Sequence, residues 1–118
     1  MEQTRQNIIQ NKSYDFARKI VLFCYQFQHE KKEYVLSKQL LRSGTSIGAN
    51  IEEAIGGISK KDFRAKMSIS YKEARETKYW LRLIKDCKLE SSENIEQLLI
   101  DLEKILKILF KIIQTASE

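Results

Sequence analysis

The sequence predicts a single all-α domain built as an antiparallel up-down four-helix bundle. Three observations lead to this fold class. The 118 residues contain no proline and four glycines, so few positions would interrupt a helix. Four segments repeat apolar residues at spacings of three and four, which places those residues on one face of each helix. The connections between the segments are short, so successive helices are expected to pack antiparallel.

The first helix is expected over residues 13–30, after a flexible N-terminal segment at residues 1–12. Ser13 suits the N-cap position, because its hydroxyl accepts a hydrogen bond from a backbone N–H of the first turn. The apolar face of this helix is formed by Phe16, Ile20, Phe23 and Phe27.

The second helix is expected over residues 36–55. Its apolar stripe consists of Leu36, Leu40, Ile47, Ile51 and Ala54. The pair Gly56 and Gly57 is expected to end it, because glycine accepts the left-handed backbone conformation that closes many helices.

Two longer amphipathic helices follow. The third is expected over residues 60–88, with Ser59 as N-cap and Asp62 at the capping-box position. Its apolar stripe comprises Phe63, Met67, Ser70, Ala74, Thr77, Leu81 and Ile84. The fourth is expected over residues 92–115, capped by Ser91 or Ser92. Its stripe comprises Ile95, Leu98, Leu99, Leu102, Ile105, Leu106, Leu109, Ile112 and Ile113.

The composition argues against several classes of protein. No stretch approaches the ~20 apolar residues that span a bilayer, and residues 1–12 are too polar for a signal peptide. We therefore expect a cytoplasmic protein. Cys24 and Cys87 match no metal or redox spacing, so both are expected to be small buried hydrophobic side chains.

Three motifs resemble catalytic or metal sites without their context. Gly44 to Gly48 match G-x-S-x-G, but a helical pattern precedes them and the single histidine lies upstream. We interpret Gly44 and Gly48 as positions that let the backbone of another helix approach closely. His29 is expected to be a solvated residue at a helix end. Glu73 and Glu76 lack the Glu-x-x-His partners of a di-iron bundle. We therefore expect no enzyme activity, no metal and no cofactor.

The second helix carries a line of polar residues. On the third helix, two acids interrupt an otherwise apolar side that also carries Ile69, Trp80, Leu83 and Cys87. Carboxylates in such a position need partners or access to water. We expect a hydrogen-bonded network, between these helices or across subunits, that comprises Arg42, Ser46, Asn50, Glu53, Glu73 and Glu76. The alternative is that both sets lie at a solvated margin.

The net charge of +5 comes essentially from the third helix, because residues 60–88 alone carry +6. Basic side chains with interleaved tyrosines are typical of phosphate contact combined with base stacking. The residues expected to bind nucleic acid are Lys61, Arg64, Tyr71, Lys72, Arg75, Lys78, Tyr79, Arg82 and Lys85. The alternative is a solvated lysine-rich face.

Self-association is also expected. Residues 20–25 of the first helix are apolar nearly all round. The apolar arc of the third helix exceeds the ~100° stripe that a monomeric bundle needs. Large apolar patches are rare on monomers, so this excess is expected to lie in a subunit interface.

Several stretches resemble a known family. The run SGTSIGANIEEA at residues 43–54, then KDF at 61–63 and KEARET at 72–77, is similar to the proteins encoded in intervening sequences of bacterial 23S ribosomal RNA genes, also called the S23 ribosomal protein family. The resemblance covers most of the chain, although Ala54 stands where many relatives have glycine. It implies an up-down bundle that assembles into a ring, pentameric in known cases. A branch related to diversity-generating retroelements implies nucleic acid and a reverse transcriptase as partners.

Two functions therefore compete. The first is a non-enzymatic homo-oligomer that binds RNA or DNA without strong sequence specificity. The second is a protein-interaction scaffold or accessory protein, for example for a reverse transcriptase, whose basic helix is merely solvated. A membrane-surface role for the fourth helix ranks third, and we expect no membrane partner.

Overall fold

The computed structural model describes residues 2–90 and 92–117, and only the backbone at Glu2 and Ser92. Four α-helices form nearly all of it: α1 (Glu2–Lys31), α2 (Val35–Ile55), α3 (Lys60–Asp86) and α4 (Ser92–Ala116). No strand occurs in these two stretches. The predicted all-α class with four helices is confirmed for this part of the chain.

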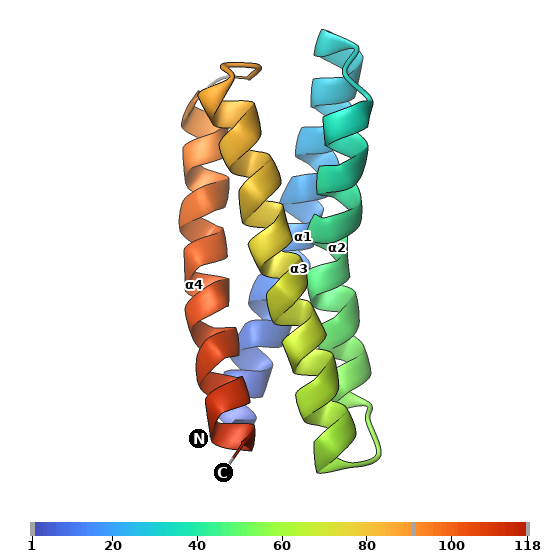
Figure 1. Cartoon of the computed structure of the whole chain (residues 1–118), viewed down its shortest axis with the longest axis vertical. Coiled ribbons are helices and arrows are strands. Elements are labelled where there is room, and N and C mark those ends of the chain that lie inside the picture. Colours follow the sequence, from blue (N-terminus) through green and yellow to red (C-terminus); the bar gives the residue numbers. More distant parts are fainter. Residues whose placement is uncertain (1, 91, 118) are drawn as a thin grey trace.

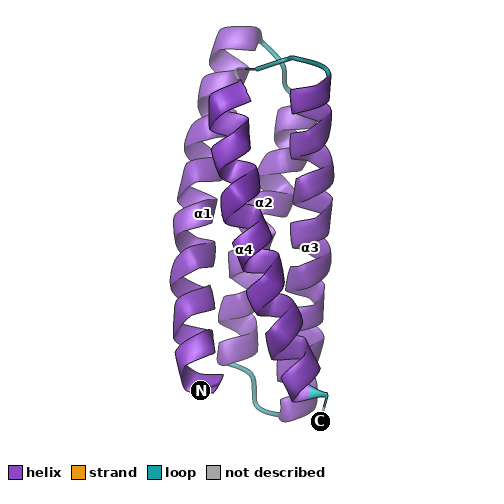
Figure 2. Cartoon of the chain, turned by 90° about the vertical axis from the view of Figure 1, so that its left-hand side faces the viewer, coloured by secondary structure: helices purple, strands orange, loops and turns teal. Residues whose placement is uncertain are grey.

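The helices lie side by side along the long axis of a molecule that measures 45 × 21 × 19 Å (Figure 1). Each helix packs against the next one in the chain, and α4 packs against α1, which closes the set (Figure 2). The connections alternate between the two ends of the bundle (Figure 1). Consequently α3 has two flanks, one toward α2 and one toward α4.

The core lies between the four helices and follows the predicted stripes. Phe16, Ile20 and Phe27 of α1 are buried, as are Ile47 and Ile51 of α2. The buried residues of α3 and α4 include Met67, Ala74, Leu81, Ile84, Ile95, Leu102, Ile105, Leu109 and Ile112. Leu36, Phe63, Leu99 and Ile113 pack at the edge of the core and are only partly buried.

The start of α1 differs from the prediction. The helix begins at Glu2, so the N-cap at Ser13 and the non-helical segment at residues 1–12 were wrong for residues 2–12; Met1 lies outside the described residues. Ile9 is fully buried and Ser13 is 1% exposed, because both continue the spacing of Phe16 and Ile20 toward the N-terminus. The Ser13 hydroxyl donates to the carbonyl of Gln10 inside the helix (3.1 Å).

The two glycines inside α2 sit where α2 meets α1. A Cβ at Gly44 would lie 2.8 Å from Cγ2 of Ile20, a distance that real contacts essentially never show. A Cβ at Gly48 would lie 3.4 Å from Oγ of Ser13. The expected close approach of a backbone is found at Gly48, where the Ser13 carbonyl oxygen would lie 3.5 Å from a Cβ. At Gly44 the close neighbour is instead the Ile20 side chain, which leaves little room for a Cβ.

The turn between α2 and α3 corrects a second expectation. Neither Gly56 nor Gly57 has a positive φ; the left-handed residues are Lys32 and Lys88, after α1 and α3. A Cβ at Gly57 would lie 3.0 Å from the backbone oxygen of Ala54, a tight contact, and 2.4 Å from Oδ2 of Asp62, the end of a side chain that can move away. The Ser59 cap is confirmed, because its hydroxyl accepts a hydrogen bond from the backbone N–H of Asp62 (3.0 Å).

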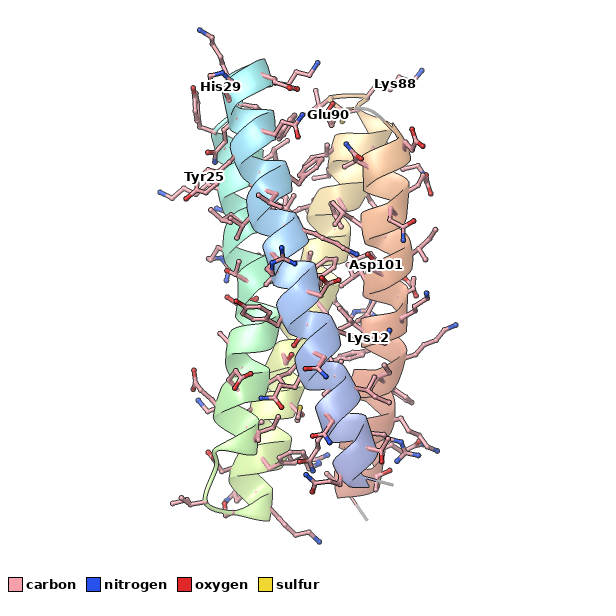
Figure 3. The ribbon with its side chains drawn as sticks, turned by 180° about the vertical axis from the view of Figure 1, so that it is seen from behind. Lys12, Tyr25, His29, Lys88, Glu90 and Asp101 are labelled. Atoms are coloured by element: carbon pink, nitrogen blue, oxygen red, sulfur yellow. The ribbon has the colours of Figure 1, made fainter. Side chains whose placement is uncertain are left out.

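The two cysteines lie in different environments. Cys24 is buried in α1, as expected, and burial raises the pKa of its thiol to about 12. Cys87 is exposed at the end of α3, so the prediction of a buried side chain was wrong there. The reason is that α3 ends at Asp86, two residues earlier than predicted. His29 is exposed near the end of α1, as expected (Figure 3). No helix in the described residues is long and apolar enough to cross a bilayer.

Candidate nucleic-acid interface between α3 and α4

A groove of about 570 Å³ runs between α3 and α4. From α3 it is lined by Tyr71, Arg75, Lys78, Tyr79 and Arg82. These residues follow one another at helical spacings, so a single face of α3 presents all of them. From α4 the lining consists of Glu103, Leu106, Lys107, Phe110 and Lys111. We call this surface the α3–α4 groove.

The groove is strongly cationic. Five of its ten lining residues are basic and one is acidic. The acid, Glu103, forms an ion pair with Nζ of Lys78 at 2.5 Å. The other four cations, Arg75, Arg82, Lys107 and Lys111, are exposed and form no ion pair with any residue that the structure describes. Their charge is therefore uncompensated at the groove.

Aromatic rings lie among these cations. The ring centroids of Tyr71 and Phe110 are 6.2 Å apart across the groove, so each helix contributes one ring of a tilted pair. Tyr79 packs edge-on against Trp80, at 5.1 Å between centroids. Tyr71 is partly buried, whereas Tyr79 is 54% exposed and Phe110 is 57% exposed. The groove thus offers apolar ring faces beside unpaired positive charge.

The nine residues that the sequence predicts to bind nucleic acid do not form one surface. Five of them line the α3–α4 groove. The other four, Lys61, Arg64, Lys72 and Lys85, are not part of its lining. Nε of Arg64 donates to Oγ of Ser117 at the end of the chain (2.8 Å). Lys85 pairs with Glu96 of α4 at 2.5 Å, which raises the pKa of the lysine.

The contribution of α4 was missed by sequence reasoning. Lys104, Lys107 and Lys111 recur at helical spacing, and no acid follows Glu103 within α4. Phe110 fell outside the predicted apolar stripe and is exposed. Both signals were present in the sequence. The sequence does not show which face of α3 Phe110 and these lysines meet, because that depends on how the two helices pack.

The other flank of α3 holds a cluster of paired charges, which we call the Arg42 cluster (Arg42, Glu73, Glu76 and Trp80). Nη1 of Arg42 donates to Oε2 of Glu73 at 2.9 Å, and Nη2 donates to Oε2 of Glu76. Nε1 of Trp80 donates to the same Glu76 oxygen at 3.1 Å. The carboxylates, Glu73 first, raise the pKa of Arg42. The bond from Trp80, and then Arg42, hold the pKa of Glu76 below its ordinary value.

The other described members of the predicted network form no bond to the side chains of this cluster. The hydroxyl of Ser46 donates to the Arg42 carbonyl (2.6 Å), and Nδ2 of Asn50 donates to the Ser46 carbonyl (2.8 Å), so both bond within α2. Glu53 accepts from Nζ of Lys66 at 2.8 Å. The Arg42 side chain is 50% exposed, so these ion pairs link α2 to α3 at a partly solvated position and not in the buried core.

Two buried hydroxyls add hydrogen bonds between α2 and α3. Oγ of Ser70 donates to the carbonyl of Ile47 at 2.8 Å. Oγ1 of Thr77 lies 2.9 Å from Oγ of Ser43, and all three hydroxyl side chains are fully buried. Sequence reasoning placed Ser70 and Thr77 only as small members of the apolar stripe. Their positions show that the α2 flank of α3 is occupied by internal bonds.

The side chains that line the groove are cations and aromatic rings, together with Glu103 and Leu106. No group of three or more His, Cys, Asp or Glu side chains gathers as metal ligands within residues 2–90 and 92–117. Ser46, the serine of the G-x-S-x-G match, lies inside α2, and its hydroxyl bonds to that helix. What the groove supplies is fixed positive charge and exposed aromatic surface.

Comparison with known proteins gives a consistent result. A crystal structure of a protein of unknown function from the S23 ribosomal protein family of Bacteroides thetaiotaomicron VPI-5482 superposes with a TM-score of 0.91. It is 44% identical in sequence, and the match covers 93% of this chain and 98% of that one. A search of curated proteins gave no match.

The family model described as 23S rRNA-intervening sequence protein matches residues 5–111. This range includes α2, α3 and most of α1 and α4, and therefore both flanks of α3. The chain belongs to the 23S rRNA-intervening sequence protein family.

Proposed function

We propose that this protein is a non-enzymatic module that binds RNA or DNA through the α3–α4 groove, without strong sequence specificity. One observation carries the proposal. Arg75, Arg82, Lys107 and Lys111 converge on a single groove from two helices and have no counter-charge among the described residues. A polyanion is the partner that such a surface fits best.

The expected mode of binding follows from the residue types. Lysine and arginine contacts to phosphates release condensed counterions, so affinity falls steeply with salt. Phosphate contacts position a nucleic acid but carry no sequence information. The lining of the groove contains no Asn or Gln, the side chains that read adenine edges in a major groove. Sequence tolerance is therefore expected.

The test is charge reversal inside the groove: Arg75→Glu, Arg82→Glu and Lys107→Glu in one variant. All three side chains are exposed, so helicity and stability should change little. Affinity for a fluorescent oligonucleotide, measured by anisotropy at low salt, should fall by about 100-fold or more. Each lost phosphate contact is expected to lower the affinity roughly tenfold. Lys72 is left intact because it lies outside the groove lining.

The matched control reverses three exposed cations elsewhere, Lys12, Lys31 and Lys38, on α1 and α2. It changes the net charge of the protein equally, so a general electrostatic effect would weaken both variants alike. Equal losses, or no binding by the unaltered protein at low salt, would contradict the proposal. The protein-interaction scaffold would then be the better account, and co-purification of a protein partner its test.

We also propose that the protein acts as a homo-oligomer, with a pentameric ring as the form that the family resemblance implies. Three large side chains of α1 project into solvent: Tyr14, Leu22 and Tyr25, each more than 60% exposed (Figure 3 labels Tyr25). Val21 and Ala17 lie between them and are only partly buried. Contiguous apolar surface of this kind is typical of an interface. An oligomer would repeat the groove and add avidity.

Light scattering coupled to gel filtration tests the assembly. A mass several times 13.9 kDa is expected at micromolar concentration. Leu22→Lys should shift it to the monomer, because the charge would be buried in the interface. The control Ile100→Lys alters an exposed residue of α4 and should leave the mass unchanged. A monomeric unaltered protein would contradict the assembly without affecting the groove.

A further inference from the structure

We infer that the α3–α4 groove takes single-stranded nucleic acid, with the ring of Phe110 as a platform on which a base stacks and Tyr79 as a second platform. This inference rests on the proposed function and specifies the ligand class of the same site. Its first basis is the placement of Phe110. The ring is 57% exposed, and it lies on a helix face whose neighbouring residues, Lys107 and Lys111, are charged.

An exposed phenylalanine on a cationic face is not what solubility or packing requires. Phenylalanine removed from water stabilises a fold by roughly 1.5–3 kcal/mol, and that gain is largely forgone at this position. The core of α4 is already filled by Leu102, Ile105, Leu109 and Ile112. Among the described residues, the ring that pairs with Phe110 is Tyr71, at 6.2 Å between centroids across the groove. The open face of Phe110 is therefore available to a ligand.

The distribution of rings and charges suits a single strand. Tyr71 and Tyr79 are eight residues apart on α3, about 12 Å along the axis at ~1.5 Å per residue. Stacked nucleotides advance ~3.4 Å per phosphate, so the groove spans roughly three to four of them. Arg75 lies between the two tyrosines and Arg82 beyond them, where phosphates of the same strand could be met. Base–aromatic stacking tolerates any base, in keeping with low sequence specificity.

A duplex could use the cations of the groove but not its two exposed rings. Its bases are stacked on one another and expose edges, not faces, so Phe110 and Tyr79 would have nothing to stack on unless a base were flipped out. The cations would still bind its phosphates. The two ligand classes therefore differ in their need for the rings, and that difference is measurable.

The experiment compares three fluorescent ligands with the same number of phosphates: oligothymidylate, an abasic oligomer without bases, and a duplex. Binding is measured for the unaltered protein and for Phe110→Leu, which keeps apolar bulk but removes the ring. The unaltered protein should bind oligothymidylate at least about fivefold more tightly than the abasic oligomer, since one stacked base contributes ~1 kcal/mol or more. Phe110→Leu should reduce this preference by about fivefold, leaving only the part that Tyr79 supplies, and should leave abasic binding unchanged.

Two further variants keep the inference falsifiable. Phe110→Trp should retain the preference, because the indole also stacks. Tyr34→Leu, an exposed ring in the connection between α1 and α2, should have no effect. Far-ultraviolet circular dichroism checks that each variant is folded.

The outcomes separate this inference from the proposed function. If the unaltered protein binds oligothymidylate and the abasic oligomer equally, or prefers the duplex, the stacking platform is overturned while nucleic-acid binding stands. If Phe110→Leu weakens both single-stranded ligands equally, the ring acts on the fold and not on a base, and the inference fails as well. If no ligand binds at low salt, the proposed function itself is wrong.

Discussion

Cations lie along both flanks of α3, but the two flanks differ in how far those cations are paired with carboxylates. On the flank toward α2, Arg42 is held by Glu73 and Glu76, and Lys66 is held by Glu53. On the flank toward α4, Arg75 and Arg82 face Lys107 and Lys111 across an open groove, with no partner among the described residues. Cations that already have carboxylate partners bind α2 to α3. Cations without partners are available to a ligand.

This contrast shows why counting charges along α3 is not enough to find a binding surface. Lys78 and Lys85 belong to the basic face of α3 in sequence, yet Glu103 and Glu96 of α4 neutralise them. Conversely, two lysines of α4 add to the groove, although α4 as a whole is not basic. The ion pairs between helices, not the composition of one helix, decide where positive charge remains without a counter-charge.

The largest effect on stability is expected from Gly44→Ala, which tests the close contact between α2 and α1. The new Cβ would lie 2.8 Å from Cγ2 of Ile20, a buried branched side chain that has little room to move. Overpacking should lower the free energy of unfolding by about 1–3 kcal/mol, measured by urea denaturation. Affinity for nucleic acid should be unchanged wherever the variant is folded, because the groove lies on the other flank.

Gly48→Ala is the matched control for this change. Its Cβ would lie 3.4 Å from Oγ of Ser13, so the space is tighter than usual but not forbidden. The gain in helix propensity, up to ~1 kcal/mol, should offset most of the strain. Equal losses at both positions would mean that Ile20 does not set the distance between α1 and α2.

Arg42→Ala should destabilise the protein by about 1–2 kcal/mol. Exposed ion pairs contribute about 0–1 kcal/mol, and the cost is larger here because Glu73, with a side chain only 17% exposed, would lose its partner. This is less than the ~3–5 kcal/mol of a fully buried pair. The double variant Arg42→Ala with Glu76→Ala should cost less than the sum of the single ones. Strictly additive effects would show that the two residues do not interact.

Glu103→Gln should improve binding, because it releases Lys78 into the groove. The expected gain in affinity is about threefold, given that an exposed pair is worth ~0.5–1 kcal/mol. The control is Glu96→Gln, which releases Lys85 outside the groove lining and should leave affinity unchanged. A gain in both variants would assign the effect to net charge, and a loss in Glu103→Gln would contradict the role of the groove.

The smallest effect concerns pH and is confined to the α2 flank. The pKa of Glu76 is lowered in the folded protein, first by the hydrogen bond from Trp80 and then by Arg42. A lowered pKa stabilises the fold above the ordinary value of 4.5, and that contribution is lost as pH falls through the folded pKa. The stability difference between the protein and Glu76→Gln should be constant near pH 7 and shrink below 4.5. A constant difference down to pH 3 would contradict this account.

Much of the fold could be predicted because it depends on local periodicity. The stripes of α2, α3 and α4 recur at helical spacing, and the residues that complete them are buried. The start of α1 could not be predicted in this way, since Ile8 and Ile9 are the only apolar pair in an otherwise polar stretch at residues 2–12 and Ser13 resembles a cap. Its helical state depends on packing against α2, where Gln10 also bonds to Glu52 (3.0 Å).

The same distinction applies to the candidate site: features within one helix could be predicted, and contacts between helices could not. Its α3 half was predicted, because Tyr71, Arg75, Tyr79 and Arg82 share a face of one helix. Its α4 half was not, since no pattern within one helix tells which neighbour Phe110 will meet. Ion pairs such as Lys78 with Glu103 depend on the register between two helices, which the sequence does not reveal.

The salt dependence of single-strand binding tests the contrast between paired and unpaired cations most directly. The slope of log K against log salt should be clearly negative and should become less steep by about 0.7 for each phosphate contact removed. Arg82→Gln removes an unpaired cation of the groove and should flatten the slope by that amount per protomer. Arg42→Gln removes a paired cation of the other flank and should leave the slope unchanged. Equal changes in both variants, or a slope near zero for the unaltered protein, would contradict the account.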